Sequence, residues 1–199
     1  MTIIDNVVPT EVTPDIEDLI DQGSIITKNI FLPNFNTLTG KIFTYEWLPT
    51  FQPKPAFYGD RMQAYPVWET KQISKIDPDN YTIILLEFQK LFKRKIINFS
   101  CFLRKTITEE LKQSAHLKDT RFGFVHIDGT KFGAVVHFEH SINGGTAFFE
   151  NCWEKKPNIE YGAFPNRLTL FSGPRCHTAC HDEIYKQRHV LCAFFDTEK

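Results

Sequence analysis

The chain has 199 residues, a formal net charge of −1, and 42% apolar and 24% charged residues. This length suits one domain with a sizeable core, and the near-neutral charge argues against a nucleic-acid partner because it creates no long-range field. The longest apolar runs are far too short to span a bilayer, so we expect no membrane partner and a cytoplasmic location.

The first half of the chain, residues 1–95, is dense in Pro, Asn and Asp and indicates helices joined by loops. Helices are predicted over 14–21 and, behind the N-cap Asp77, over 78–93, and a looser candidate covers 34–47. Four prolines within 48–68 predict extended loop or short turns there. We expect this half to be an extension that packs on the rest of the chain.

Beyond residue 95 the pattern changes to strands separated by Gly, Asn and Pro. Alternation predicts a strand over 96–104, and Thr106 with Glu109 predicts a capping box that opens a helix over 106–116. Further strands are predicted over 121–127, 131–140, 146–150, 167–171, 175–180 and 188–195. Many short strands with regular turns indicate a sandwich or barrel. We therefore expect a mainly β protein with N-terminal helices, whose core is residues 96–199.

The five cysteines are odd in number and irregular in spacing. This favours free thiols in a reducing compartment over a disulfide framework. A zinc or haem site around Cys176 and Cys180 is the less favoured alternative. On a strand these two cysteines face one way, whereas His177 and His181 face the other.

His126 and Asp128 are the first residues that point to chemistry. Residues i and i+2 of a strand project from one face, so imidazole and carboxylate lie side by side, as a metal site needs. The alternative is an ordinary strand end at which Asp128 opens an Asp-Gly turn. A second histidine, His177, and then Arg188 follow on later predicted strands. Two histidines and one carboxylate leave iron positions open for other ligands, and an arginine can fork with a carboxylate.

Two histidines compete for the third metal position. On one strand His177 and His181 lie about 13 Å apart, so both cannot bind the same ion. We favour His177 because it lies near the start of its strand, after the Gly173–Pro174 turn. His181 begins a polar stretch that is typical of a connecting loop, where a ligand would be poorly fixed.

From about residue 96 to its end, the chain resembles the 2-oxoglutarate and iron(II)-dependent dioxygenase superfamily, the prolyl-4-hydroxylase-like branch in particular. The stretches that carry the resemblance are His126-Ile127-Asp128, 132–138, 144–149, 166–171, His177 and Arg188. The resemblance implies a double-stranded β-helix core, that is, a cupin-like jelly-roll. The spacing of eleven residues between His177 and Arg188 also suits this family.

The resemblance implies that His126, Asp128 and His177 are catalytic and hold Fe(II). It implies that Arg188 binds the distal (C5) carboxylate of the cosubstrate 2-oxoglutarate. Dioxygen would then hydroxylate a C–H bond of a small molecule or an amino-acid side chain, with release of succinate and carbon dioxide. Related halogenases have a small residue where Asp128 stands, so halogenation is not expected.

A second cosubstrate-binding residue, often a Tyr in this family, has no evident counterpart. The equivalent region offers Asn98, Ser100, Arg104 and Arg121. His137 either approaches the pocket or is an ordinary packing residue of its strand.

The rival interpretation is a cupin-like protein that binds a metal or a small ligand without oxygenase activity. Arg188 discriminates between the two, because such a protein needs no carboxylate-binding arginine at that place. The sequence leaves open the substrate, the choice between hydroxylation and desaturation, the role of residues 1–95, and the oligomeric state.

Overall fold

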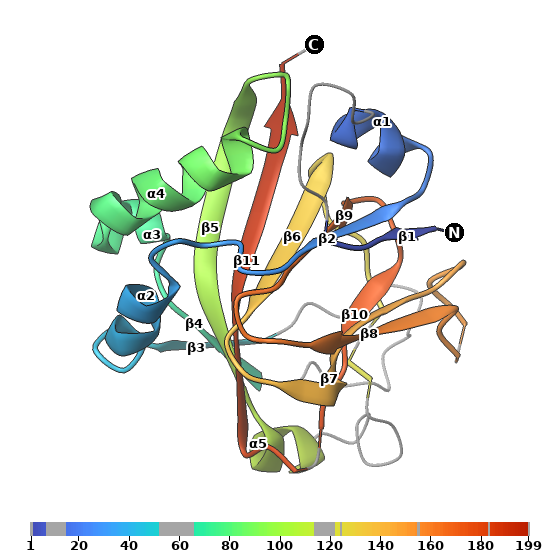
Figure 1. The fold of residues 1–199 in the computed structure, drawn as a ribbon. Coiled ribbons are helices and arrows are strands. Elements are labelled where there is room, and N and C mark those ends of the chain that lie inside the picture. The colour runs from blue at the N-terminus through green and yellow to red at the C-terminus, as the bar shows by residue number, and fades with distance from the viewer. Residues whose placement is uncertain are drawn as a thin grey trace.

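A computed structural model describes residues 2–6, 15–51, 66–113, 122–123, 125–154, 156–182 and 184–198. Figure 1 shows its strands in two layers. The large sheet has eight strands in the order β1-β2-β9-β6-β11-β5-β4-β3, and the small sheet has the order β10-β7-β8. The strands are β1 Ile3–Ile4, β2 Ile25–Lys28, β3 Leu48–Phe51, β4 Pro66–Glu69, β5 Ile96–Ile107, β6 Phe132–His137, β7 Ser141–Phe148, β8 Ile159–Ala163, β9 Leu168–Ser172, β10 His177–Ala179 and β11 Gln187–Thr197.

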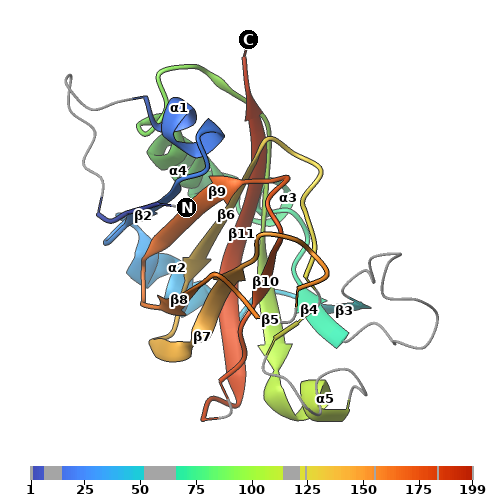
Figure 2. The same cartoon turned by 90° about the vertical axis from the view of Figure 1, so that its right-hand side faces the viewer.

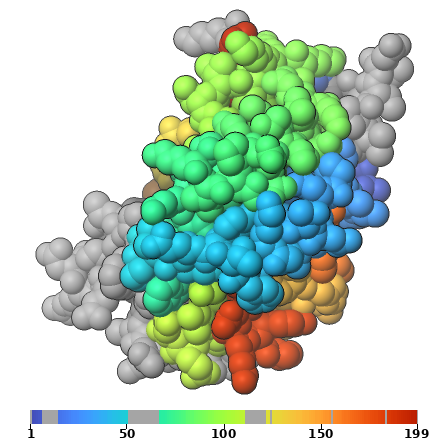
Figure 3. Space-filling model, turned by 90° about the vertical axis from the view of Figure 1, so that its left-hand side faces the viewer, coloured from blue at the N-terminus to red at the C-terminus, as the bar shows by residue number. Residues whose placement is uncertain are grey.

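Helices α2, α3 and α4 cover one face of the large sheet, which we call its outer face (Figures 1 and 3). No helix in the described part of the chain is long and apolar enough to cross a membrane. The helices are α1 Ile16–Asp21, α2 Phe35–Lys41, α3 Ile73–Ile76, α4 Pro78–Gln89 and α5 Thr108–Gln113.

The outer face is held by a cluster of aromatic rings. Phe195 of β11 lies with its ring centroid 5.3–5.4 Å from those of Phe88, Phe92 and Phe132. All four side chains are at most 5% exposed. Burial of such rings is the main stabilising contribution of this layer, at about 25 cal/mol per Å² of apolar surface.

The opposite face of the large sheet, its inner face, meets the small sheet (Figure 2). Leu191 and Phe195 of β11 belong to the outer core, so Arg188, Val190 and Cys192 project inward. His137 of β6 lies directly opposite Val190 in the strand register and therefore also faces inward. The inner face thus carries the polar residues of these central strands.

The mainly β fold expected from the sequence is confirmed, with several local differences. Helix α4 begins behind Asp77, whose carboxylate accepts from the Asn80 amide at 3.3 Å, but it ends at Gln89. The predicted capping box at Thr106 is wrong, because Thr106 lies inside β5, paired with Arg188. Over 121–127 the described residues form only isolated bridges, at Phe122 and His126.

Strands from both halves of the chain pair in the large sheet. Strand β2 pairs with β9, and β4 pairs with β5. None of β1–β4, nor β8, was predicted. The division into an extension over 1–95 and a core over 96–199 stays a prediction, because strand pairing between the two halves does not decide whether they are separate units.

The expectation of free thiols is wrong for two of the five cysteines. Cys152 and Cys176 form a disulfide across 24 residues, with their Cα atoms 5.1 Å apart. The chain reverses after β7 and brings Cys152 beside β10, where the Phe149 amide donates to the Cys176 carbonyl at 2.9 Å. Cys101, Cys180 and Cys192 are free and buried.

Candidate metal centre

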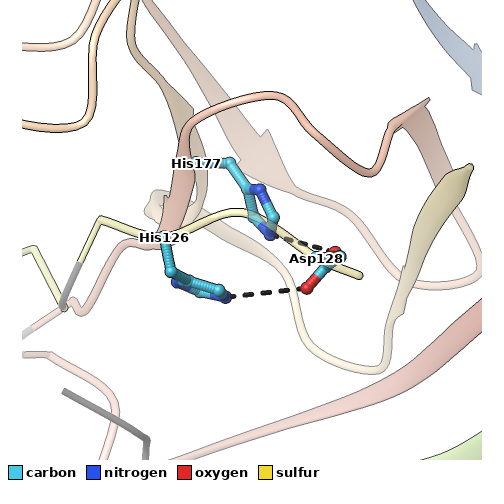
Figure 4. A group of neighbouring side chains, drawn as sticks. All are labelled: His126, Asp128 and His177. Atoms are coloured by element: carbon cyan, nitrogen blue, oxygen red, sulfur yellow. Dashed lines mark ion pairs between the residues drawn. The ribbon is translucent and has the colours of Figure 1, made fainter. Parts of the chain in front are cut away.

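Three of the predicted site residues meet at one end of the two layers. One ligand atom from each of His126, Asp128 and His177 lies within 4.8 Å of the others. The His177 Nε2 is 3.5 Å from Asp128 Oδ2, and the His126 Nε2 is 4.0 Å from Asp128 Oδ1. Figure 4 shows the three side chains pointing toward one another. Within the described part of the chain, this is the only cluster of metal-binding side chains of this kind.

Backbone pairing fixes the two histidines relative to each other. His126 and His177 form an antiparallel bridge in which each amide donates to the other's carbonyl at 2.9 Å. The Asp128 amide donates to the Gly173 carbonyl at 2.8 Å. All three ligand positions are therefore held by hydrogen bonds before any metal arrives, which reduces the ordering that binding requires.

Hydrogen bonding and burial prepare His177 to act as a ligand. Its Nδ1 lies 2.8 Å from the Arg175 carbonyl, an acceptor only, so Nδ1 carries the proton and Nε2 presents its lone pair to the site. Burial, with a smaller contribution from the nearby Arg104 guanidinium, lowers the pKa of His177 to about 4, although the hydrogen bond to the Arg175 carbonyl acts in the opposite direction. The imidazole is therefore neutral at pH 7, as metal binding requires.

Asp128 is a buried carboxylate whose charge lacks full compensation within the protein. Burial raises its pKa, although His126 and Arg104 act in the opposite direction. Its Oδ2 is buried without a hydrogen-bond partner. A buried, poorly compensated carboxylate beside two imidazoles suits a divalent cation, because the cation supplies the missing positive charge. The residues therefore fit a 2-His-1-carboxylate metal site.

Gly133 is a site residue whose role the sequence did not suggest. A Cβ at this position would lie 2.7 Å from Asp128 Oδ2 and 2.7 Å from the Phe171 ring. Gly133 therefore makes room for the ligand carboxylate. The signal was a glycine within the strand predicted over 131–140, since a glycine inside a strand often marks a close approach.

The other predicted site residue, Arg188, lies on the inner face of β11 and outside the three-residue cluster. Its Nη2 donates to the Gly145 carbonyl of β7 at 3.2 Å and so joins the two sheets. His181, the rival for the third ligand, follows the end of β10 and is not part of the cluster. The geometry thus favours His177.

Comparison with solved structures gives the nature of the fold. No protein-family model and no curated protein matches the sequence. An oxidoreductase of the 2OG-Fe(II) oxygenase family from Burkholderia pseudomallei superimposes with a TM-score of 0.59 at 10% identity, over 90% of this chain and 88% of that one. A Trichoplax adhaerens prolyl hydroxylase, in complex with a hypoxia inducible factor peptide fragment, gives 0.57 at 11% identity, over 90% and 86%.

A third structure similar to this chain belongs to an enzyme that is named for a different reaction. The alpha-ketoglutarate-dependent epimerase SnoN of nogalamycin biosynthesis gives a TM-score of 0.57 at 10% identity, over 86% of this chain and 75% of that one. The three proteins share an architecture and differ in the reactions that their names describe. Together with the jelly-roll layers described above, these likenesses show that this chain has the fold of the 2-oxoglutarate- and iron(II)-dependent oxygenases.

Proposed function

We propose that this chain is a 2-oxoglutarate- and iron(II)-dependent oxygenase that hydroxylates a C–H bond. The observation that carries the proposal is the meeting of His126, Asp128 and His177 within 4.8 Å, at one end of an oxygenase-type jelly-roll. Two imidazole nitrogens and one carboxylate oxygen form the donor set of non-haem iron(II) oxygenases and leave coordination positions open.

Each residue has a defined part in the proposed site. His126, Asp128 and His177 hold Fe(II), and the Arg175 carbonyl keeps His177 in the ligating tautomer. Arg188 binds the distal carboxylate of 2-oxoglutarate. Bound iron and cosubstrate supply the activation of dioxygen, so that one oxygen atom enters the substrate and the other enters succinate, with loss of carbon dioxide. The His177 imidazole is neutral at pH 7 and therefore available as a ligand.

The proposed substrate is a small molecule or an amino-acid side chain. The His126 and Asp128 side chains are 19% and 11% exposed, so one side of the cluster adjoins solvent. The Trichoplax relative is bound to a peptide, which supports a side-chain substrate. Hydroxylation is favoured over halogenation because Asp128 supplies a carboxylate to the metal.

The test is succinate release from 2-oxoglutarate by the purified protein with Fe(II) and ascorbate, first without and then with a library of metabolites and peptides. We expect slow succinate formation that requires iron and increases with the correct substrate. A protein that binds metal yet never consumes 2-oxoglutarate would instead be a cupin-like binding protein.

A matched pair of histidine variants tests the ligand set in the same assay. His177→Ala should lose iron(II) binding and succinate formation. His181→Ala removes a histidine only four residues away and should retain most of both. The reverse order in an iron titration would make His181 the third ligand.

A further inference from the structure

The space between the two sheets holds buried polar atoms that no protein group satisfies. Both ring nitrogens of His137 lack a hydrogen-bond partner, and its side chain is 1% exposed. The hydroxyls of Thr146 and Thr169 are also buried without partners. Each such atom costs about 1–3 kcal/mol if it stays unpaired. Several in one region therefore indicate a polar ligand or bound water.

The strand register brings these groups to one place. Thr169 of β9 lies opposite Val135, two residues before His137 on the inner face of β6. Arg188 lies two residues before Val190, the register partner of His137. His137 and Arg188 are therefore diagonal neighbours on one face of the sheet.

The small sheet closes the same region from the other side. Arg188 donates to the carbonyl of Gly145, the residue before Thr146. Tyr161, the register partner of Thr146, lies under the Arg167 guanidinium, 5.3 Å from its ring centroid. Arg188 and Arg167 also both act electrostatically on His137, so the region carries positive charge that suits an anion.

We infer that His137 is the second cosubstrate-binding residue and donates an N–H to the distal carboxylate of 2-oxoglutarate beside Arg188. This inference rests on the proposed function and deepens it. Arg188 supplies the charge, and His137 supplies a neutral donor that satisfies an oxygen lone pair left by the guanidinium.

The charge state of His137 is consistent with this role. Burial lowers its pKa well below the usual value, and Arg188 and Arg167 lower the pKa further. The imidazole is therefore neutral near pH 7 and carries one N–H. A neutral donor does not repel the adjacent guanidinium, whereas a second cation there would.

The test compares His137→Phe with the wild type. Phe keeps the ring volume and removes both nitrogens. With Mn²⁺ in place of Fe²⁺ to prevent turnover, calorimetric titration should give 2-oxoglutarate binding that is about 10- to 100-fold weaker in the variant. Affinity for Mn²⁺ alone should be unchanged. His137→Gln, which keeps an N–H donor, should recover part of the affinity.

Two further measurements separate ligand binding from a structural role. The ligand-free His137→Phe protein should melt at the same temperature as the wild type or higher, because an unsatisfied polar group is removed. Its affinity for 2-oxopentanoate, which has a methyl group in place of the distal carboxyl, should match that of the wild type. His140→Phe, an exposed histidine on the same segment, should change neither value.

The outcomes are distinguishable. If the wild type does not prefer 2-oxoglutarate to 2-oxopentanoate, the proposed cosubstrate and this inference both fail. If the wild type prefers 2-oxoglutarate and His137→Phe binds it equally well, only the role of His137 is overturned, and the ring holds a buried water instead. A lowered melting temperature with unchanged selectivity would assign His137 to packing.

Discussion

The two faces of the large sheet are both buried but differ in chemistry. The outer face packs Phe88, Phe92, Phe132 and Phe195 under the helices, and these rings leave no polar atom to satisfy. The inner face carries His137, whose two ring nitrogens lack hydrogen-bond partners, and the cluster at its end includes Asp128 Oδ2, which also lacks a hydrogen-bond partner. The outer face thus provides stability. The inner face retains polar groups whose unsatisfied state costs stability, a cost that is common at functional sites.

The largest expected effect is on activity, at Asp128. Asp128→Ala removes the only carboxylate of the proposed ligand set and should abolish detectable succinate formation and most iron(II) binding. The metal-free variant should unfold at the same urea concentration as the wild type or higher, because it no longer buries an unpartnered carboxylate oxygen. Asp79→Ala, at an exposed position in α4, is the control. Full activity in Asp128→Ala would refute the ligand assignment.

The outer face should show the opposite pattern. Phe195→Ala opens a cavity among four aromatic neighbours, including Phe99, and should lower the free energy of unfolding by about 3–5 kcal/mol. Iron(II) affinity of the folded fraction should stay within a factor of a few. A variant with wild-type stability and lost metal binding would show that the two faces are not separable in this way.

A substitution at Gly133 tests the point where the sheet meets the site. Gly133→Ala places a methyl group 2.7 Å from both Asp128 Oδ2 and the Phe171 ring, so one of them must move. We expect a loss of about 1–3 kcal/mol in the free energy of unfolding, together with weaker iron(II) binding. Denaturation measures the first effect and metal titration measures the second. Gly40→Ala, on α2 with open space around it, should leave metal binding unchanged and raise stability by up to about 1 kcal/mol. Normal metal affinity in Gly133→Ala would mean that Asp128 does not need this space.

The smallest expected effect is the pH dependence of the free energy of unfolding. Burial holds the pKa of His137 well below its usual value and lowers that of His181 to about 3. Below about pH 6.5 the unfolded chain binds protons that the folded protein excludes, so the free energy of unfolding falls as pH decreases. The slope is at most about 1.4 kcal/mol per pH unit for each histidine.

Urea unfolding of the metal-free protein between pH 6.5 and 5 measures this slope. His137→Phe should reduce the dependence by up to one proton, and exposed His140→Phe should leave it as it is. Carboxylates such as Asp77, whose pKa is lowered to about 2, act only at lower pH. An equal slope in wild type and His137→Phe would show that His137 is protonated in the folded protein.

The sequence predicted the central strands and the shared side of His126 and Asp128 because both depend on local pattern. His126 and Asp128 are two residues apart, so the alternation of a strand indicated their shared side, although that segment forms only an isolated bridge at His126. The N-cap Asp77 acts within three residues along the chain and was likewise visible.

What the sequence could not predict depends on distant pairing. Strand β8 forms only because β7 offers it a partner, and Thr106 stays in β5 because β11 pairs with it there. The space that Gly133 leaves for Asp128 is visible only in the three-dimensional structure. The lack of hydrogen-bond partners for His137 is likewise visible only there, because it depends on all the neighbours of the ring and on no single motif.

The disulfide between Cys152 and Cys176 has a practical consequence for handling the protein. It closes a loop of 24 residues, a constraint worth about 3 kcal/mol against the unfolded chain, and Cys176 directly precedes the proposed ligand His177. Dithiols added to keep iron ferrous would attack this bond by thiol exchange and loosen the segment that carries the ligand. Ascorbate has no thiol to exchange, so it can maintain ferrous iron while the bond stays closed. A comparison of activity in the two reductants therefore measures how strongly the position of the proposed ligand His177 depends on the disulfide.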